Sequence, residues 1–443
     1  MDLFMAARWQ MTLSLVFHIV FAAIGIGLPL LLVLVERKYL RTGQEHYRRL
    51  ARTWARAVGV LFAVGAISGT ALAFELGLLW PRYMEATGPV VGHLFALEGF
   101  AFFLEAIFIG LYVYGWDRVS PRTHWWCGVV IAASGMVSGI LILGVNAWMQ
   151  IPAGFDLPAY LASGRISVSD PVAIFKQPAW LYMALHSTLS CYIAVSFAVA
   201  AIYAWGMLRG RDDPAHRSAI RLALGVGLIA AVLQPFSGDA MAKFVFRTQP
   251  AKFAAMEGQF RTQTYAPLRL GGLPDEANSR TDYAIEIPGG LSFLASMNPA
   301  TEVRGLDSIP RSNWPNVALT HASFQVMVVL GAIMFIVAAW FWIALWRKGK
   351  SATQSRWLLR ALVVCGPLGF LALEAGWMVT EVGRQPWVIQ GILRTSDAVT
   401  PAAGVQPVFY AFTALYLLLA IAVVLVVRRV TRKPAEEPAR AEA

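Results

Sequence analysis

The sequence has few charged residues and very few cysteines for its length. Of its 443 residues, 14% are Asp, Glu, Lys or Arg and 57% are hydrophobic, which excludes a soluble globular protein and indicates a polytopic membrane protein. Cys127, Cys191 and Cys365 fall in or beside apolar segments, without the spacings of zinc, iron–sulfur or covalent haem sites. Covalent haem c and iron–sulfur ligation are therefore disfavoured, and any haem must be held by other side chains.

Long apolar segments make up most of the chain. Nine of them are long enough to cross a bilayer. They lie at about 11–35, 57–80, 90–115, 125–149, 179–206, 219–246, 317–346, 357–381 and 406–428. The first is too long for a signal peptide and lacks a small-residue cleavage site, so we expect it to remain as a helix. The sequence predicts an all-α integral membrane protein with about nine transmembrane helices.

Lys and Arg are distributed unevenly among the loops. They gather after spans one, three, five, seven and nine, whereas the short loops on the other side hold few of them. The positive-inside rule then places the N-terminus outside and the C-terminus inside. This distribution explains the net charge of +11 without nucleic acid, with anionic lipid as the neighbour of the basic loops.

Composition divides the chain into four parts. Spans one to six occupy 1–246, a polar segment rich in Pro, Gly, Asp and Asn occupies 247–316, spans seven to nine occupy 317–428, and a tail rich in Pro, Ala and charge occupies 429–443. A polar segment as long as 247–316 is usually functional or disordered, and we place it outside. We expect the tail to be disordered inside the cell.

Two histidines lie well inside the spans. Four others lie at helix ends or in loops, where we expect them to be solvated: His93, His124, His216 and His321. His18 has apolar neighbours in the first span, and imidazole is the commonest nitrogen ligand of haem iron. The alternative is a histidine bonded to a backbone carbonyl of a neighbouring helix. His186 and Met327 lie early in spans five and seven, which the deduced topology places at the same depth, as two axial ligands of one haem require. By itself, a methionine in an apolar helix is more often a packing residue.

The third span carries two carboxylates. Glu98 and Glu105 are seven residues apart, so on a helix they share one face about 10 Å apart along the axis. Buried carboxylates on one face can relay protons, although they can also be structural groups bonded to neighbouring Ser or Trp side chains.

A polar run sits where the eighth span meets water. It reads Gly376-Trp377-x-x-x-Glu381-x-Gly-Arg384-Gln385-Pro-Trp387. A carboxylate and a guanidinium at a membrane edge cost several kcal/mol unless each has a partner, so both are functional candidates. The run resembles the haem-site signature of subunit I of cytochrome bd-type quinol oxidases, membrane enzymes that reduce oxygen to water.

Further motifs resemble the same family, in order along nearly the whole chain. They are Ala7-Arg8-Trp-Gln followed by Phe17-His18, Glu98-Gly with Phe-Phe-Leu-Glu105, Gly238-Asp, Gln249-Pro-Ala-Lys252-Phe-Ala-Ala-Met-Glu257, and Phe324-Gln-Val-Met327-Val. The chain departs from several relatives at Gln325, where they have Arg, and in the spacing of the two glutamates, which is eight residues in some of them.

The resemblance implies a set of cofactors and their ligands. A low-spin haem b would be held by His186 and Met327. A high-spin pair, consisting of one haem b and either haem d or a further haem b, would be ligated through His18 and Glu381, with the choice between the two ligands open. The residues that it places in the haem pockets are Arg8, Trp377 and Gln385.

The same resemblance implies the course of the reaction. Membrane quinol would be oxidised at Lys252 and Glu257, Arg384 would stand among the catalytic groups, and protons would reach the oxygen site past Glu105 and Glu98. The implied partners are quinol, oxygen, the lipid bilayer of a prokaryotic cell membrane and a second membrane subunit. A small accessory subunit is compatible with this set, and nucleic acid has no place in it.

Two other classes of function remain open at this stage. One is a proton-coupled secondary transporter, which the lack of a visible internal repeat disfavours. The other is a haem-bearing quinol electron carrier that never contacts oxygen, in which Glu381 and His18 would have no obvious use. An absorption spectrum distinguishes the transporter, which would be colourless.

Overall fold

The structure, a computed structural model, describes residues 2–167, 170 and 173–432. Within these residues, nine helices are long and apolar enough to cross a membrane, in agreement with the sequence. They are α1 (Leu3–Thr42), α2 (Glu45–Leu79), α3 (Pro81–Tyr114), α4 (Pro121–Gln150), α6 (Pro178–Leu208), α7 (Pro214–Thr248), α10 (Val317–Lys348), α11 (Arg356–Val382) and α13 (Val405–Arg432). The predicted tail lies outside the described residues from 433 onward.

The helices begin where the local sequence supplies start signals. Four of them, α3, α4, α6 and α7, carry proline in the first turn, where a missing N–H costs nothing. Ser120 and Asp213 cap α4 and α7 by accepting hydrogen bonds from backbone N–H groups three residues on. Each helix extends beyond its apolar span into polar residues, because the hydrogen-bonded backbone does not end where hydrophobicity does.

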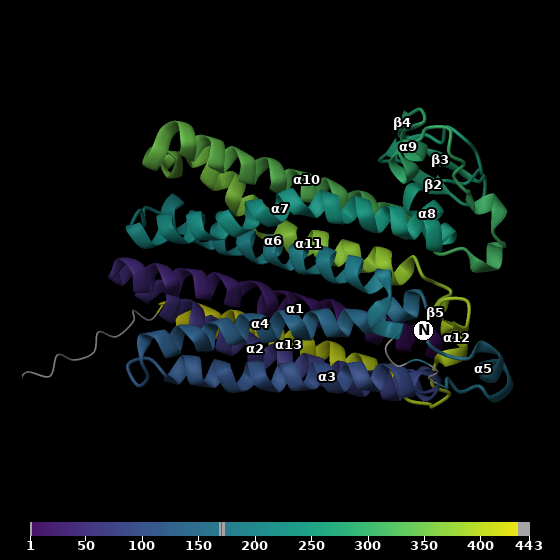
Figure 1. Cartoon of the computed structure of the whole chain (residues 1–443), viewed down its shortest axis with the longest axis horizontal. Helices are drawn as coiled ribbons and strands as arrows, with labels where there is room; N and C mark the ends of the chain where they lie inside the picture. Colours follow the sequence, from purple (N-terminus) through teal and green to yellow (C-terminus); the bar gives the residue numbers. More distant parts are fainter. Residues whose placement is uncertain (1, 168–169, 171–172, 433–443) are drawn as a thin grey trace, which may run out of the picture.

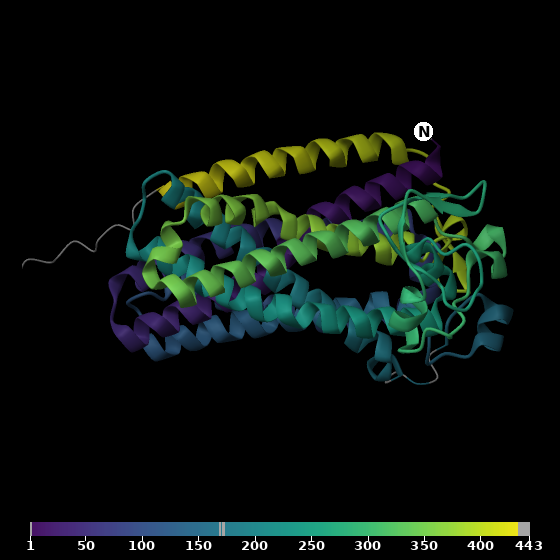
Figure 2. The ribbon, with the colours of Figure 1, turned by 90° about the horizontal axis from the view of Figure 1, so that it is seen from above.

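The long helices form two packed groups (Figure 1). In one, α1 packs against α2 and α4, and α3 packs against α4; in the other, α6 packs against α7 and α11, and α10 against α11. The groups meet where α1 and α4 contact α6. Helix α13 runs along one edge beside α1 and α2 (Figure 2). The core therefore consists of seams between helices.

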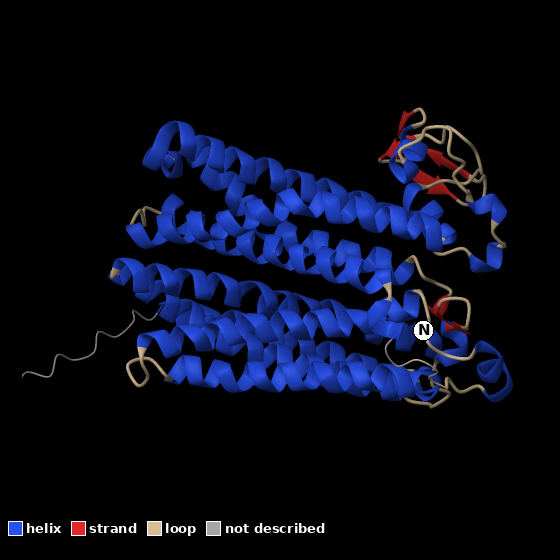
Figure 3. Cartoon of the chain, in the orientation of Figure 1, coloured by secondary structure: helices blue, strands red, loops and turns tan. Residues whose placement is uncertain are grey.

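The polar segment between α7 and α10 is folded. It contains two short helices and two separate two-stranded antiparallel sheets, β1 with β4 and β2 with β3. Its elements are α8 (Pro250–Glu257), β1 (Leu268–Leu270), β2 (Leu273–Asp275), β3 (Arg280–Asp282), β4 (Ile285–Ile287), α9 (Gly290–Ser296) and the 3₁₀ helices η2 (Leu306–Ser308) and η3 (Arg311–Asn313). The segment forms a cap at one end of the bundle (Figure 3).

Other short elements gather at the same end of the bundle as this cap (Figure 1). They are α5 (Leu157–Ser163), η1 (Ala173–Lys176), β5 (Trp387–Ile389), β6 (Leu393–Arg394) and α12 (Thr395–Ala398). One further 3₁₀ helix, η4 (Gly349–Gln354), joins α10 to α11. We use the term cap end for the end of the bundle that carries the cap, β5 and the N-terminus.

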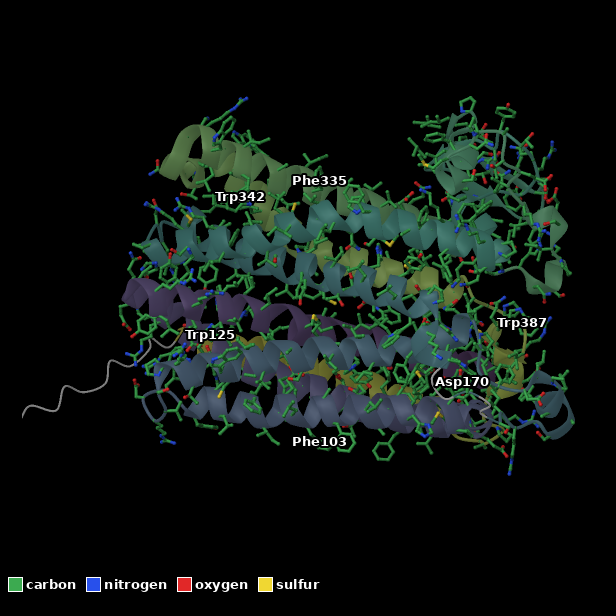
Figure 4. All side chains as sticks on the ribbon, in the orientation of Figure 1. Phe103, Trp125, Asp170, Phe335, Trp342 and Trp387 are labelled. Carbon is green, nitrogen blue, oxygen red and sulfur yellow. The ribbon has the colours of Figure 1, made fainter. Side chains whose placement is uncertain are left out.

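Large apolar side chains point outward along the bundle. Phe103 on α3 is 67% exposed and Phe335 on α10 is 39% exposed, both on the outer flanks (Figure 4). Trp387 lies at the cap end and Trp125 near the opposite end (Figure 4). Tryptophan near both ends of an apolar belt is the pattern that membrane interfaces favour.

Candidate functional site

His18 is held in one orientation by a serine of the neighbouring helix. Its Nδ1 lies 3.0 Å from Oγ of Ser68 on α2, and that hydroxyl donates to the carbonyl oxygen of Gly65 at 3.1 Å. When the hydroxyl gives its single hydrogen to Gly65, Nδ1 is the donor to Ser68. Nε2 is then left with a free lone pair, the form in which imidazole binds a metal.

His186 is held in the same way. Its Nδ1 lies 3.0 Å from Oγ of Ser237 on α7, which donates to the carbonyl oxygen of Gln234 at 2.8 Å. The same reasoning leaves Nε2 of His186 with the lone pair that can accept a hydrogen bond or bind a metal. The side-chain amide nitrogen of Gln234 lies 3.2 Å from this Nε2, so binding of iron would replace that contact.

A glycine follows each of these serines and makes room for the imidazole. A Cβ added at Gly69 would lie 2.9 Å from Cε1 of His18, and one at Gly238 would lie 3.3 Å from Cε1 of His186. The Ser-Gly dipeptide thus provides a hydrogen bond and a bare backbone surface for each ring. Gly238, which belongs to one of the motifs that resemble the family, thus lies against His186.

Met327 points toward a glycine of α11. A Cβ added at Gly376 would lie 3.1 Å from the Met327 sulfur. Helices α6 and α10 each contact both α7 and α11, so they stand diagonally across a group of four helices. His186 and Met327 lie eight and ten residues from starts at the cap end, about 12 and 15 Å along their helices. Their distances from the cap-end starts of the two helices are therefore similar, which a common depth requires.

Glu381 lies one residue before the end of α11 and has two side-chain partners. Its Oε1 accepts a hydrogen bond from the Asn146 amide of α4, and its Oε2 accepts one from Nη2 of Arg384 at 2.5 Å. Arg384 is 2% exposed, and among the described residues its Nε and Nη1 have no partner. Buried guanidinium donors without acceptors are costly, so this pocket suits an anionic group such as a carboxylate.

Trp377 connects Glu381 with the helix that carries His18. It lies one turn before Glu381 and packs in one cluster with Ile19 of α1 and Cys191 of α6. Ile19 directly follows His18 in the chain. The structure therefore brings the indole to the helix junction near both candidate iron ligands.

Arg8 and Gln385 occupy different surroundings. The Arg8 guanidinium, half-buried in the first turns of α1, lies 5.4 Å from the ring centre of Phe4. Gln385 is fixed in the turn after α11, where it donates to the Glu381 carbonyl at 3.4 Å and accepts from Thr395 at 2.8 Å. Gln385 thus holds the turn behind Glu381.

These donors fit haem. A neutral imidazole paired with a thioether is a known axial set for six-coordinate haem iron, and imidazole and carboxylate oxygen are both iron ligands. Two further features favour haem. The glycines beside the imidazole rings leave room for it, and the unpartnered nitrogens of Arg384 suit its carboxylates. Among the described residues, no group of three or more His, Cys, Asp or Glu side chains could hold a metal ion directly.

Glu98 and Glu105 both face α4. Oε1 of Glu98 accepts a hydrogen bond from Ser138 at 2.9 Å. Oε1 of Glu105 has no partner in the described part of the chain, and it lies 3.1 Å from where a Cβ of Gly135 would be. On one face of α3, the Glu98 carboxyl is thus hydrogen-bonded, whereas Oε1 of Glu105, two turns further on, is not.

The same face of α3 leads to a buried cluster that the sequence interpretation missed. Tyr112, seven residues after Glu105, donates to Glu36 of α1 at 2.5 Å, and Nδ1 of His124 on α4 lies 2.8 Å from the same carboxylate. All three are at most 3% exposed. The expectation that His124 is solvated at a helix end is wrong, because α1 and α3 cover the start of α4.

Lys252 is buried between the cap and the bundle. It is 5% exposed, and its Nζ donates to Gln150 at 2.5 Å and to the Thr380 carbonyl at 3.2 Å. Burial, assisted by the positive charge of Arg384, lowers the pKa of Lys252 to about 7.

Glu257 ends α8 on another side of that helix. Burial raises its pKa to about 7, although the Arg269 guanidinium acts in the opposite direction. Its Oε2 has no partner among the described residues. Among the described residues, Lys252 and Glu257 are not paired with each other, because the five-residue spacing turns them to different sides of α8 and Lys252 donates to Gln150 and Thr380. They are two separate buried groups.

His321 is a further residue that sequence reasoning missed. It was expected to be solvated, yet it is fully buried, with Nδ1 2.8 Å from the Met256 carbonyl and Nε2 3.0 Å from the Gly271 carbonyl. It thereby ties α10 to the end of α8 beside Glu257. Its position near a helix start gave no hint of burial, because the covering residues lie in the cap.

Comparison with known proteins finds similar chains that belong to one family. The sequence pattern of the family described as Cytochrome bd terminal oxidase subunit I matches residues 6–435. A Bacillus subtilis (strain 168) protein, provisionally named a cytochrome bd menaquinol oxidase subunit I, is 37% identical over 99% of this chain and 98% of its own. Cytochrome bd ubiquinol oxidase subunit 1 of the same organism is 31% identical over 97% of this chain and 94% of its own. The structure matches a chain of the bd oxidase from Geobacillus thermodenitrificans with a TM-score of 0.91 and 36% identity, covering 97% of this chain and 98% of that one.

Proposed function

The chain belongs to the cytochrome bd terminal oxidase subunit I family, and on that premise we propose how its residues divide the work of a quinol:oxygen oxidoreductase. The protein is a haem-containing subunit of a multi-pass terminal oxidase in the bacterial plasma membrane. The oxidase takes electrons from membrane quinol and reduces oxygen to water. Bound haem supplies the one-electron and oxygen chemistry that side chains lack.

His186 and Met327 would hold the low-spin haem b. The support is their matched depth on diagonal helices and the Ser237 hydrogen bond that leaves Nε2 of His186 free. A thioether as second ligand raises the reduction potential relative to two imidazoles. With both residues as its ligands, the haem would suit electron transfer and would not bind oxygen.

His18 and Glu381 would ligate the high-spin pair, one haem b and either a haem d or a further haem b. Ser68 orients His18, while Asn146 and Arg384 orient the Glu381 carboxylate. The unpartnered nitrogens of Arg384 would bind a haem carboxylate. Trp377 would pack against the pair.

Quinol would be oxidised in the cap. Glu257, with a free carboxylate oxygen and a pKa near 7, would accept a proton from the quinol hydroxyl, and Lys252 would donate a hydrogen bond to the quinone oxygen. With the N-terminus outside, the cap lies outside and the released protons leave there.

Protons for oxygen reduction would come from the inside along α3. Glu105 and Glu98 share the face toward α4, and Tyr112 continues that face to Glu36 and His124. Release outside and uptake from inside separate charge across the membrane, which generates the proton gradient.

The pair of serine-held histidines carries this proposal, since in each the bond from Nδ1 to the serine leaves Nε2 as the nitrogen that can bind iron. Purified protein should show haem absorption bands that change on reduction by quinol, and it should consume oxygen with quinol. A colourless preparation would point to a transporter. Haem bands without oxygen uptake, in the complete complex, would point to an electron carrier.

A further inference from the structure

Three hydrogen bonds connect the cap lysine to the carboxylate at the end of α11. Lys252 donates to Oε1 of Gln150 at 2.5 Å, and Nε2 of Gln150 donates to Oδ1 of Asn146 at 3.3 Å. Asn146 in turn donates from Nδ2 to Oε1 of Glu381. Gln150 is the last residue of α4 and Asn146 lies one turn before it, so a single helix end supplies both links.

The donor and acceptor chemistry of the end groups fixes the direction of these three hydrogen bonds, which we call the hydrogen-bond chain. An ammonium group can only donate, so Gln150 must offer its oxygen to Lys252 and has only its NH₂ left for Asn146. A carboxylate can only accept, so Asn146 must offer its NH₂ to Glu381 and its oxygen to Gln150. Both amides therefore point the same way, from the cation to the anion, and flipping either of them would break two bonds.

The hydrogen-bond chain is buried, so the alignment of its amides can strengthen the bonds. Lys252 and Gln150 are 5% and 2% exposed, and the carbonyl of Thr380 accepts a second bond from each of them at 3.2 and 3.3 Å. In a medium of low dielectric constant, aligned hydrogen bonds polarise one another, and a charge at one end is felt at the other. Without Lys252 the amide of Gln150 would lose its only charged donor.

We propose that Gln150 and Asn146 are positioning residues that couple Lys252 to Glu381. This inference rests on the proposed function, in which Lys252 contacts quinol and Glu381 ligates iron. Through the chain, the contacts that Lys252 makes in the cap set the orientation and electron donation of the Glu381 carboxylate. The ligand environment of the haem bound to Glu381 would therefore depend on the contacts of Lys252 with quinol, through three hydrogen bonds and two intervening side chains.

The charge of Lys252 can also act on the Glu381 carboxylate directly, without the hydrogen-bond chain. Arg384 bonds to Glu381 and lies near Lys252, so charge at Lys252 can act on the carboxylate without Gln150. The two routes differ in what Gln150 contributes. Removing the Gln150 amide abolishes coupling through the chain and leaves the direct effect unchanged.

A double-mutant cycle separates these routes. The variants are Lys252→Met, Gln150→Leu and the pair together, in the intact complex, and the readout is the midpoint potential of the Glu381-ligated haem from a redox titration. We expect Lys252→Met to shift this potential, and the shift to fall to about half or less when Gln150 is Leu. Lys243→Met, which removes a lysine paired with Asp239 on α7, should give the same shift in both backgrounds.

Equal effects of Lys252→Met in both backgrounds, or no effect in either, overturn the proposal. If Gln150→Leu assembles poorly, Gln150→Met replaces it, because methionine is unbranched and uncharged like glutamine but lacks the oxygen that accepts from Lys252 and the NH₂ that reaches Asn146. Glu381→Ala separates the two claims. If it leaves every haem band unchanged, the ligand assignment fails; if it removes a band while the cycle is additive, only the coupling fails.

Discussion

At the scale of single residues, the histidines depend on serines that carry no chemistry themselves. Ser68 and Ser237 each give their only hydrogen to a carbonyl of their own helix and accept from an imidazole Nδ1. Such partners of metal ligands fix the tautomer and the orientation of the ring. The two Ser-Gly dipeptides are visible in the sequence, but only the packing of α1 on α2 and of α6 on α7 shows what they face.

Ser68→Ala and Ser237→Ala should each weaken one haem site. Without the hydroxyl, the ring can rotate and Nε2 can take the proton, so haem binding at that site should fall by about tenfold or more. Haem content and the reduced-minus-oxidised spectrum of the purified complex measure this. Ser190→Ala on α6, whose hydroxyl donates to the Ser187 carbonyl, is the control. Full haem occupancy in both Ser68→Ala and Ser237→Ala would contradict the role of the serines.

Quinol oxidation should depend on pH near neutrality. Burial raises the pKa of Glu257 to about 7, so below that pH the carboxyl is protonated and cannot accept a proton from quinol. Burial lowers the pKa of Lys252 to about 7, so above that pH the amine loses the proton it donates. kcat/KM for quinol should therefore rise toward pH 7 and fall above it.

Glu257→Gln tests the acid side of that profile. The amide cannot take a proton, so turnover should drop by about a hundredfold while all haem bands remain. A profile that keeps its rise toward pH 7 in Glu257→Gln would assign the titration to another group.

At the scale of elements, the sequence predicts the helices well and their contacts poorly. Each of the nine spans is confirmed, because a bilayer needs about twenty apolar residues whatever the neighbours are. The cap escaped this reasoning because its strands are three residues long and lack a measurable period. The burial of Lys252 and His124 escaped it too, because the groups that cover them lie on other elements.

Glu98 and Glu105 on α3 are the carboxylates that we expect to carry protons to the oxygen site. Glu105→Gln keeps the shape but cannot titrate, so oxygen reduction should fall by at least about tenfold while quinol still reduces the low-spin haem. An oxygen electrode and stopped-flow absorbance on one preparation measure the two effects. Glu45→Gln, an exposed change at the start of α2, should have neither effect. Parental oxygen uptake in both Glu105→Gln and Glu98→Gln would move the path to another helix, with Glu75 and Glu374 as the next candidates.

At the scale of the whole molecule, the bundle exposes much apolar surface. Helix α3 presents Phe100, Phe103 and Ile107 outward, at 75%, 67% and 61% exposure, while its other face carries Glu98 and Glu105. A helix with polar groups this near lipid is better shielded by another protein than by acyl chains.

We therefore predict a complex with a second membrane subunit. Isolation in mild detergent should give a particle larger than the 48.5 kDa chain, with a second membrane polypeptide in a constant ratio. Mass photometry with subunit analysis by mass spectrometry measures this. Full oxidase activity from the single chain at its own mass would contradict the prediction.

The central claim is that one chain separates electron uptake from oxygen reduction, with His186 and Met327 serving the first and His18 and Glu381 the second. The most direct test is stopped-flow absorbance of Glu381→Ala, mixed with quinol and then with oxygen, beside the parent protein. The account predicts that the low-spin band is reduced at the parental rate, while a high-spin band is missing and oxygen uptake falls to the background. Parental oxygen uptake in Glu381→Ala, with every haem band intact, would contradict it.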